Sequence, residues 1–412
     1  MKTHNPKKAW NWIKKTSKVG KLNSFTVQPI QDKNGNLVSS TEEQLVIWHG
    51  HYKKHASDLS GLSLSFDYWY ETPSDSRFIF PRLAEWDINQ EITVEEVKSA
   101  ILSTPNFKAS DPDGIPIEFY KALIPPENSS DNSENTNAPS YGINCLLLLF
   151  NRIWNGDFPK SWNEASIVSI SKKGDPTNCD NYRGISLINN GIKLISKILA
   201  TRISEYGLEN NFIRPEQFGF RKKEECISLF ISIHDICRRR QLNNQETYLA
   251  FLDLKKAYDS DPIGNIIHKI DCLGIRGKSF KFIENLCLTS KANVKLNGQY
   301  SESFRIMKGV RQGCPLSPIL FNLFINDIFN DCQDYGVPLN GSYCCGGLFA
   351  DDIVLCAPSR SNLKKLLKKV NNWAIYNKMV FGINKCATMV VRPETPLFQN
   401  IDPTFYLASS HS

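Results

Sequence analysis

The sequence predicts an α+β fold in which a small, mainly antiparallel sheet packs on helices. Three short β-rich runs predict strands at residues 165–170, 248–254 and 348–356. Between them lie long stretches whose apolar residues recur at helical spacing, including residues 191–203, 227–238, 319–329 and 363–373. Because the strands are few and widely separated, we expect the helices to back the sheet.

Length and composition indicate an intracellular protein with two or three domains or subdomains. The chain has 412 residues, of which 41% are hydrophobic and 22% charged, as is ordinary for a globular protein. The longest apolar stretch, residues 145–150, is far shorter than the ~20 residues that span a bilayer. No apolar segment follows the lysine-rich start, so it does not resemble a secretory signal. We expect a protein that is neither secreted nor membrane-spanning.

Neither the charge nor the cysteines identify a function. The net charge is +7, but residues 1–22 contain seven lysines and no acid, and the charges of the remaining chain cancel. We slightly favour a solvated or disordered tail over a nucleic-acid contact as the interpretation of this start. The twelve cysteines include no Cys-x-x-Cys pair. We therefore expect reduced thiols, several of them in the core, rather than a zinc site or a disulfide framework.

The first ~90 residues are predicted to form a partly helical lead-in. Thr41 with Gln44 has the spacing of a capping box, and the helix it would open carries Leu45, Trp48 and Tyr52 on one face. Thr93 with Glu96 predicts a second capped helix. Residues 125–140 contain no large apolar side chain, which indicates a flexible surface insertion.

Three carboxylates interrupt two of the apolar β-rich runs. Asp253 follows Phe251 on one face of a predicted strand, and Asp351 and Asp352 stand within a run that could form both arms of a hairpin. Carboxylates among apolar neighbours, and adjacent to one another, are costly unless a cation neutralises them. Oxygen-only ligands favour Mg²⁺ or Mn²⁺. Three carboxylates around two such ions form the clamp used in phosphoryl transfer.

A third segment, residues 309–318, fits the same chemistry. Its two glycines allow a ligand to approach the backbone closely, and Ser317 followed by Pro318 predicts the start of a buried helix. Arg311 and Gln312 precede this start and are candidates to touch a nucleotide or base pair. Each segment alone has an ordinary alternative, because Asp-Asp pairs are common in turns and loops commonly precede core helices.

Taken in order, the three segments resemble the reverse transcriptases of non-LTR (LINE-type) retrotransposons. Residues 251–259 resemble the first catalytic motif of that family, residues 309–318 the motif that contacts nucleotide and template, and residues 349–352 the signature hairpin. The resemblance covers roughly residues 90–407. It implies a right-hand polymerase with a lead-in at 1–94, fingers at 95–245, a palm at 246–407 and a truncated tail at 408–412.

The resemblance also implies roles for individual residues. Asp253, Asp351 and Asp352 would hold two Mg²⁺ (or Mn²⁺) ions, and Tyr258 would exclude a ribose 2′-hydroxyl. Lys173 and Arg183 would bind triphosphate oxygens. The Lys173 ammonium would act as a point charge, and the planar Arg183 guanidinium would bind in a forked geometry. Lys385 would protonate pyrophosphate. Gln312 and Gly313 would contact the nucleotide, residues 215–221 resemble the template-side segment, and residues 108–115 resemble the start of the domain.

The implied partners are an RNA template, a DNA primer and dNTPs. The sequence departs from the family pattern at Asp261, which places an extra acid near the metal site, and at residues 406–408, where the final motif ends in Ala408. No thumb, endonuclease or Cys/His cluster is recognised, so the chain resembles a piece of a longer polyprotein. Two alternatives stay open: an inactive remnant that only binds nucleic acid, and an RNA-templated RNA polymerase, against which Tyr258 argues.

Overall fold

The computed structural model describes residues 28–71, 82–109, 113–125, 140–221, 224–339, 341–393, 403–405 and 407. The lysine-rich start, most of the predicted insertion, part of the 108–115 motif, Tyr406 and the tail at 408–412 lie outside these ranges. Among the described residues, no helix is long and apolar enough to cross a membrane.

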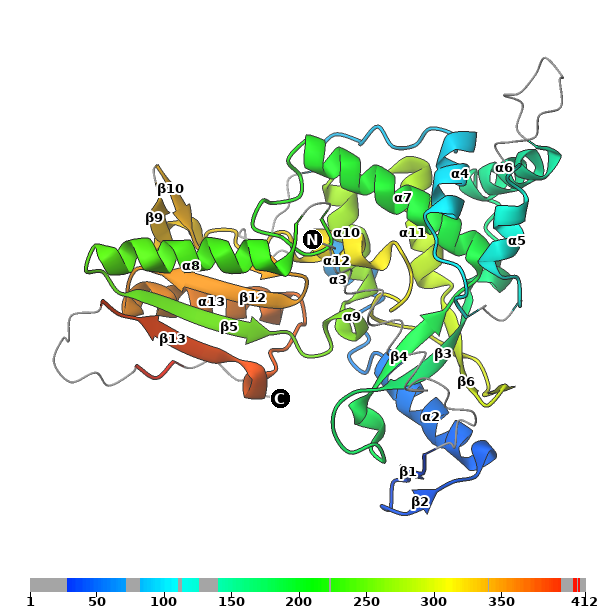
Figure 1. Cartoon of the computed structure of the whole chain (residues 1–412), viewed down its shortest axis with the longest axis horizontal. Helices are drawn as coiled ribbons and strands as arrows, with labels where there is room; N and C mark the ends of the chain where they lie inside the picture. The colour runs from blue at the N-terminus through cyan, green and yellow to red at the C-terminus, as the bar shows by residue number, and fades with distance from the viewer. Residues whose placement is uncertain are drawn as a thin grey trace, which may run out of the picture.

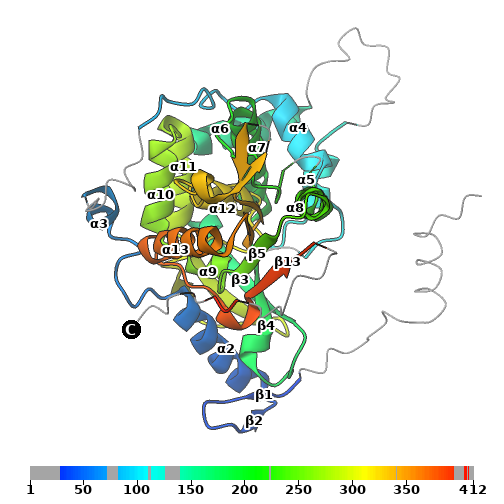
Figure 2. The ribbon, with the colours of Figure 1, turned by 90° about the vertical axis from the view of Figure 1, so that its left-hand side faces the viewer.

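A four-stranded antiparallel sheet carries the catalytic candidates. Its order is β11 (Gly346–Phe349), β12 (Asp352–Ala357), β5 (Thr247–Asp253) and β13 (Ala387–Val391). Alternating residues of the central strands bury opposite faces: Leu249 and Cys356 pack with α8 (Cys226–Leu242), and Leu252 and Leu355 pack with α13 (Arg360–Tyr376). Figures 1 and 2 show β5 between these two helices. The predicted sheet and hairpin are thus confirmed.

A second sheet is mixed rather than antiparallel. It contains β4 (Tyr182–Leu187), β3 (Glu164–Ser171), β6 (Lys291–Leu296), β7 (Gln299–Tyr300) and β8 (Phe304–Arg305). β3 pairs in parallel with β6, while its pairing with β4 is antiparallel. Strands from both sides of the expected fingers–palm boundary at residue 245 therefore share one sheet. The boundary drawn on the sequence does not separate the two sheets.

One apolar core joins the helices to the antiparallel sheet. At its centre, α12 (Ser317–Ile325) is buried on all sides, as its sequence predicts. Around it the chain places α4 (Val94–Leu102), α5 (Ile117–Ala122), α6 (Tyr141–Trp154), α7 (Asn190–Glu209), α10 (Ile263–Cys272) and α11 (Gly277–Leu288). A small hairpin, β9 (Val337–Leu339) with β10 (Ser342–Cys344), lies beside α8 (Figure 1). All twelve cysteines are free thiols and six of them are buried, as expected.

The described part of the lead-in packs against the rest of the domain. It forms β1 (Ile30–Gln31), β2 (Leu37–Val38), α2 (Thr41–Ala56) and α3 (Phe66–Glu71). β1 and α2 lie on the second sheet, and α3 lies on α10. Trp48 and Tyr52 of α2 are 2% and 8% exposed, and they join a core cluster with Ile167 and Val294 of the sheet. The sequence identified this apolar face of α2 but not its partner.

Of the three helix starts predicted from capping residues, the structure has one as predicted. Thr93 and Glu96 form the predicted capping box. At α2 the cap is Ser40 rather than Thr41, and the Gln44 side chain donates instead to two backbone carbonyls of the lead-in. At α12 the cap is Leu316 and Ser317 is the first helical residue; its hydroxyl donates to the Arg311 carbonyl oxygen at 2.7 Å.

Candidate active site

The three candidate carboxylates meet at one end of the antiparallel sheet. β5 ends at Asp253, and Asp352 at the start of β12 is its paired residue on the neighbouring strand. Asp351 lies in the turn between β11 and β12. Asp253 and Asp351 line a cavity of about 550 Å³, whereas Asp352 is exposed and does not contribute to its lining.

The turn that carries Asp351 is supported by the segment expected to lie beside the template. Ala350 has φ +57°, a left-handed conformation that costs a residue with a Cβ about 1–2 kcal/mol. Its amide donates to Oε1 of buried Gln217 at 3.2 Å. Backbone hydrogen bonds from Leu348 to Glu216 (2.8 Å) and from Phe218 to Leu348 (2.9 Å) fasten the same segment to β11. Residues 216–219 thus hold the turn in place.

Charge at this end of the sheet favours a bound cation. Burial, followed by the neighbouring carboxylates, raises the pKa of both Asp351 and Asp352. Asp253 accepts hydrogen bonds from the Lys385 ammonium at 3.1 and 3.2 Å. The site consists of carboxylate oxygens, with Lys385 as its direct counter-charge in the described part of the chain. This is the donor set that a hard divalent cation requires.

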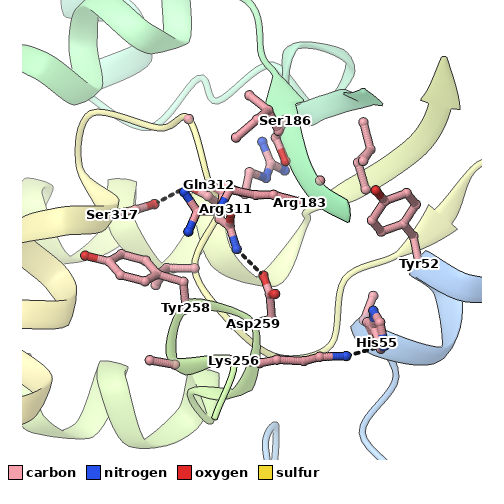
Figure 3. A pocket seen from close by; sticks show the side chains of 18 of the residues that line it. Tyr52, His55, Arg183, Ser186, Lys256, Tyr258, Asp259, Arg311, Gln312 and Ser317 are labelled. Carbon is pink, nitrogen blue, oxygen red and sulfur yellow. Dashed lines mark hydrogen bonds between the residues drawn. The ribbon is translucent and has the colours of Figure 1, made fainter. Parts of the chain in front are cut away.

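Gln312 is held rigidly on the opposite wall. Its Nε2 donates to Oδ1 of Asp259 at 2.8 Å, and its carbonyl accepts from the Ser186 amide of β4 at 2.8 Å (Figure 3). Gly313 has φ +122°, and a Cβ at this position would lie 2.6 Å from the Ser186 carbonyl oxygen. Only glycine allows the loop to approach β4 this closely.

Tyr258, in the short helix α9 (Ala257–Ser260), forms an aromatic wall of the cavity. Its ring stacks on Phe321 of α12 with centroids 4.8 Å apart and planes inclined by 23°. Phe220 contacts the ring edge-on at 6.3 Å. The hydroxyl is buried without a hydrogen-bond partner among the described residues, and burial raises its pKa. The ring is therefore fixed by packing rather than by polar contacts.

Arg311 lines the cavity and also makes hydrogen bonds that its position in the sequence did not suggest. The residue is 7% exposed, and its Nε donates to Oγ of Ser290 at 2.8 Å. Its Nη2 donates to the Asn163 carbonyl oxygen at 2.5 Å. The guanidinium connects the loop to the end of α11 and the start of β3. Two of its guanidinium nitrogens therefore make structural hydrogen bonds, while the residue also lines the cavity.

Comparison with known proteins agrees with this geometry. The family model described as reverse transcriptase (RNA-dependent DNA polymerase) matches residues 170–407, more than half of the chain. The chain belongs to the reverse transcriptase family. Its expected resemblance to non-LTR retrotransposon reverse transcriptases is confirmed by the curated relatives.

The relatives are polyproteins and polymerases of mobile elements. The chain is 28% identical over 271 residues to the Pol polyprotein of the type-2 retrotransposable element R2DM of Drosophila melanogaster, covering 64% of this chain and 25% of the relative. It is 26% identical over 312 residues to the RNA-directed DNA polymerase of the element jockey of the same species, covering 74% and 32%. It is 25% identical over 390 residues to the RNA-directed DNA polymerase of jockey from Drosophila funebris. That alignment covers 89% of this chain and 42% of the relative. The chain thus spans between a quarter and about two fifths of these relatives.

Among solved structures, a telomerase from Candida Tropicalis truncated from its C-terminal domain is similar at 15% identity with a TM-score of 0.41. The alignment covers 58% of this chain and 52% of the telomerase. A second telomerase structure from the same organism, in complex with a fragment of telomeric RNA, matches with the same TM-score and covers 56% and 41%.

Cations of this reverse transcriptase domain surround the cavity on the side facing β3 and β4. Lys172 and Arg183 line the cavity, whereas Lys173 is absent from its lining. The Lys172 amide continues the strand pairing by donating to the Asn181 carbonyl oxygen at 2.7 Å. Consecutive side chains of an extended segment point in opposite directions, so only one of the two lysines can face inward. Burial, and then Arg183, lower the pKa of Lys172.

Several cavity residues were not recognised from the sequence. They are Lys172, Phe220, Asp259 and three residues of α2, namely His51, Tyr52 and His55. Asp259 could have been suspected from its place in the first catalytic motif. The α2 residues carried no signal, because nothing in the sequence pairs residues 51–55 with a strand more than a hundred positions away.

Asp261, the departure from the family pattern, is completely buried. Burial of its ionised carboxylate destabilises the folded protein. Both carboxylate oxygens lack hydrogen-bond partners among the described residues. Burial, and then Asp259, raise its pKa well above the usual value. Because the folded protein binds this proton more tightly than the unfolded chain does, the carboxyl destabilises the fold increasingly as the pH rises from the unfolded pKa of about 3.9 toward the folded value.

We expect Asp261→Asn to stabilise the protein at pH 7 without added metal, because an amide never ionises. The gain should shrink as the pH falls below about 4, where Asp261 is protonated in both the folded and unfolded chains. Thermal unfolding at pH 4 and pH 7 measures the difference, with the exposed Asp334→Asn as control. A variant that is less stable than the wild type at pH 7 but not at pH 4 would show that the carboxylate has a stabilising partner.

Proposed function

We propose that the chain extends a primer on an RNA or DNA template by nucleotidyl transfer from dNTPs, as an RNA-directed DNA polymerase domain. The observation that supports this most strongly is the meeting of Asp253, Asp351, Tyr258 and Gln312 around one cavity. These residues come from β5, the β11–β12 turn, α9 and the loop before α12. Family membership supports the reaction class.

Reverse transcriptase domains generally use divalent metal ions. We propose that Asp253, Asp351 and Asp352 hold two Mg²⁺ or Mn²⁺ ions here. Ions bound at such a trio would lower the pKa of the primer 3′-hydroxyl and neutralise charge on the triphosphate. The carboxylates themselves fix the position of the primer end relative to the α-phosphate, because they sit on paired strands and a supported turn.

The remaining cavity residues are suited to a nucleoside triphosphate. The 3′-oxygen would form a bond to the α-phosphorus while the bond to pyrophosphate breaks. We propose that Arg183 and Lys172, rather than Lys173, bind the triphosphate oxygens, since they line the cavity. Lys385 would leave Asp253 and give its proton to the departing pyrophosphate. Gln312 and Gly313 would place the base and sugar against β4.

Tyr258 would select deoxynucleotides by occupying the space beside the sugar that a 2′-hydroxyl needs. We expect Tyr258→Val to increase the incorporation of rNTPs relative to dNTPs at least tenfold, about 1.4 kcal/mol of lost discrimination. Single-nucleotide primer extension measures the ratio of kcat/KM for the two substrates. The exposed Tyr343→Val serves as the matched control. An unchanged ratio in Tyr258→Val would mean that another residue excludes the 2′-hydroxyl.

Primer extension tests the proposed function as a whole. The 412-residue chain is incubated with an oligo(dT) primer on poly(rA), dTTP, and Mg²⁺ or Mn²⁺. The same reaction is run with EDTA and with an Asp351→Ala, Asp352→Ala double variant. We expect metal-dependent extension by the wild type only. Replacing poly(rA) with poly(dA) determines which template is accepted.

Two results would contradict the proposal. A wild-type chain that is folded by circular dichroism and binds the duplex, yet adds no nucleotide under either metal, would indicate an inactive remnant. If the double variant extended the primer at the wild-type rate, the activity would come from another component of the preparation and not from these carboxylates.

A further inference from the structure

Outside the carboxylate centre, two histidines of α2 and an aspartate of the β3–β4 connection converge at the cavity. His51 and His55 are four residues apart and therefore lie on the same face of the helix, with ring centroids 4.2 Å apart. Asp180 comes from the turn that joins β3 to β4. One ligand atom of each residue lies within 4.8 Å of the others. Among the described residues, this group brings its ligand atoms closer together than the three catalytic carboxylates do.

The centre of this group already attracts a positive charge. The Lys256 ammonium lies 2.8 Å from Nε2 of His55 and 3.3 Å from Oδ1 of Asp180 (Figure 3). An ammonium group can only donate hydrogen bonds, so Nε2 of His55 must be the unprotonated nitrogen. Its lone pair is therefore directed at the cation, in the same way as it would be directed at a metal. The opposite nitrogen carries the proton.

The geometry suits a transition metal better than a hard cation. Imidazole nitrogens with one carboxylate are ligands of Zn²⁺, Co²⁺ and Ni²⁺, whereas Mg²⁺ prefers oxygen. In a tetrahedral zinc site with bonds of about 2.0–2.1 Å, ligand atoms lie about 3.3 Å apart. Nε2 of His55 and Oδ1 of Asp180 are 3.9 Å apart. Side-chain rotation alone can close this difference, since Asp180 is 66% exposed.

We propose that His51, His55 and Asp180 form a binding site for a divalent transition metal such as Zn²⁺, which displaces the Lys256 ammonium. The site would clamp the lead-in helix to the turn between β3 and β4, next to Lys172 and Arg183. Lys256 directly precedes α9, so its release would free a cation beside Tyr258 and Asp259. The metal would thereby alter the charge of the cavity without belonging to the catalytic carboxylates.

Metal binding can be measured without any assay of polymerase activity. Co²⁺ is titrated into the reduced 412-residue chain in excess Mg²⁺, which occupies the carboxylate centre. We expect one Co²⁺ per chain with visible d–d bands and without the thiolate charge-transfer absorption that ligation by the free cysteines would give. Zn²⁺ should abolish the bands by competition. The Asp351→Asn, Asp352→Asn double variant should bind Co²⁺ like the wild type.

Three variants test the assignment of the ligands. His51→Gln with His55→Gln should lower the Co²⁺ affinity at least tenfold, and His49→Gln, on another face of the same helix, should not. Lys256→Met should raise the affinity, because it removes the competing cation from the centre. Circular dichroism checks that each variant is folded.

Each of the following results would overturn the proposal. One is no binding of Co²⁺ or Zn²⁺ by the wild type in excess Mg²⁺. Another is an unchanged spectrum and affinity in the His51→Gln, His55→Gln variant. A Lys256→Met variant with wild-type affinity would overturn the displacement of the ammonium, even if the histidines bind the metal.

Discussion

Asp351→Asn should lower kcat/KM for dTTP incorporation at least about 1,000-fold, the equivalent of roughly 4 kcal/mol. Asp351 is the carboxylate that both lines the cavity and lies in the supported turn, and an amide removes its charge while keeping its size. The raised pKa of Asp351 means that burial already opposes its ionised form. A divalent ion is the natural source of the compensating charge. Steady-state primer extension over a range of Mg²⁺ concentrations provides the measurement.

The effect of the same substitution at the neighbouring Asp352 provides a comparison for Asp351→Asn. Asp352 is exposed and outside the cavity lining, so Asp352→Asn should cost less than Asp351→Asn and should be rescued partly by higher Mg²⁺. Asp334→Asn, an exposed aspartate outside the cavity, should leave kcat/KM unchanged. Equal losses at Asp351 and Asp352 would indicate that both carboxylates contact the same ions. Wild-type activity in Asp351→Asn would refute the proposed role of Asp351.

Asp327→Ala should destabilise the fold by about 3–5 kcal/mol, because it leaves a buried lysine without its counter-charge. Lys269 is 2% exposed, and its ammonium donates to Oδ1 of Asp327 at 2.8 Å and to the Phe324 carbonyl oxygen at 2.7 Å. Oδ1 of Asp327 also accepts from the Trp373 indole at 2.9 Å. The pair thereby joins α10, the end of α12 and α13. Urea unfolding followed by circular dichroism measures the free energy of unfolding.

A surface ion pair provides the control for this experiment. Arg152 and Asp157 form a 3.0 Å pair whose side chains are 76% and 66% exposed, so Asp157→Ala should change stability by no more than about 1 kcal/mol. Replacing Lys269 and Asp327 together by Met and Leu should recover much of the loss, because no unpaired charge then remains. A loss below about 1 kcal/mol in Asp327→Ala would show that Lys269 is adequately solvated or neutralised without Asp327.

Local patterns in the sequence predicted the elements well where burial and backbone chemistry act together. The strands around Asp253 and Asp352 were identified because an apolar run must be buried on both faces, and the structure covers those faces with α8 and α13. The start of α4 followed from the Thr93 capping box. The mixed second sheet was not predicted, because β6 joins β3 through a parallel pairing between residues more than a hundred positions apart. Periodicity identifies a buried face but not the element that covers it.

The same limit explains which parts of the site were missed. The carboxylates were found because charge inside an apolar run is anomalous in any structure. The hydrogen bonds of Arg311 were not predicted, since its partners Ser290 and Asn163 approach it only in the folded chain. The choice between Lys172 and Lys173 depended on the register of β3 with β4, which no local pattern specifies. His51 and His55 became neighbours of the cavity through the packing of the whole lead-in.

The family match begins at residue 170, whereas β3 begins at Glu164 and is the strand that joins β4 to β6. The segment that the family model matches is therefore smaller than the segment that folds. A recombinant domain cut at residue 170 would lose most of β3 and all of α2. It would leave the β3-facing edge of β6 at residues 291–294 unpaired, and Val294 and Phe304 without their cover. Such a product exposes an open strand edge beside apolar surface, the usual starting point for aggregation. Expression trials and evolutionary comparisons of this element should respect the folding unit, which extends back to at least Ile30.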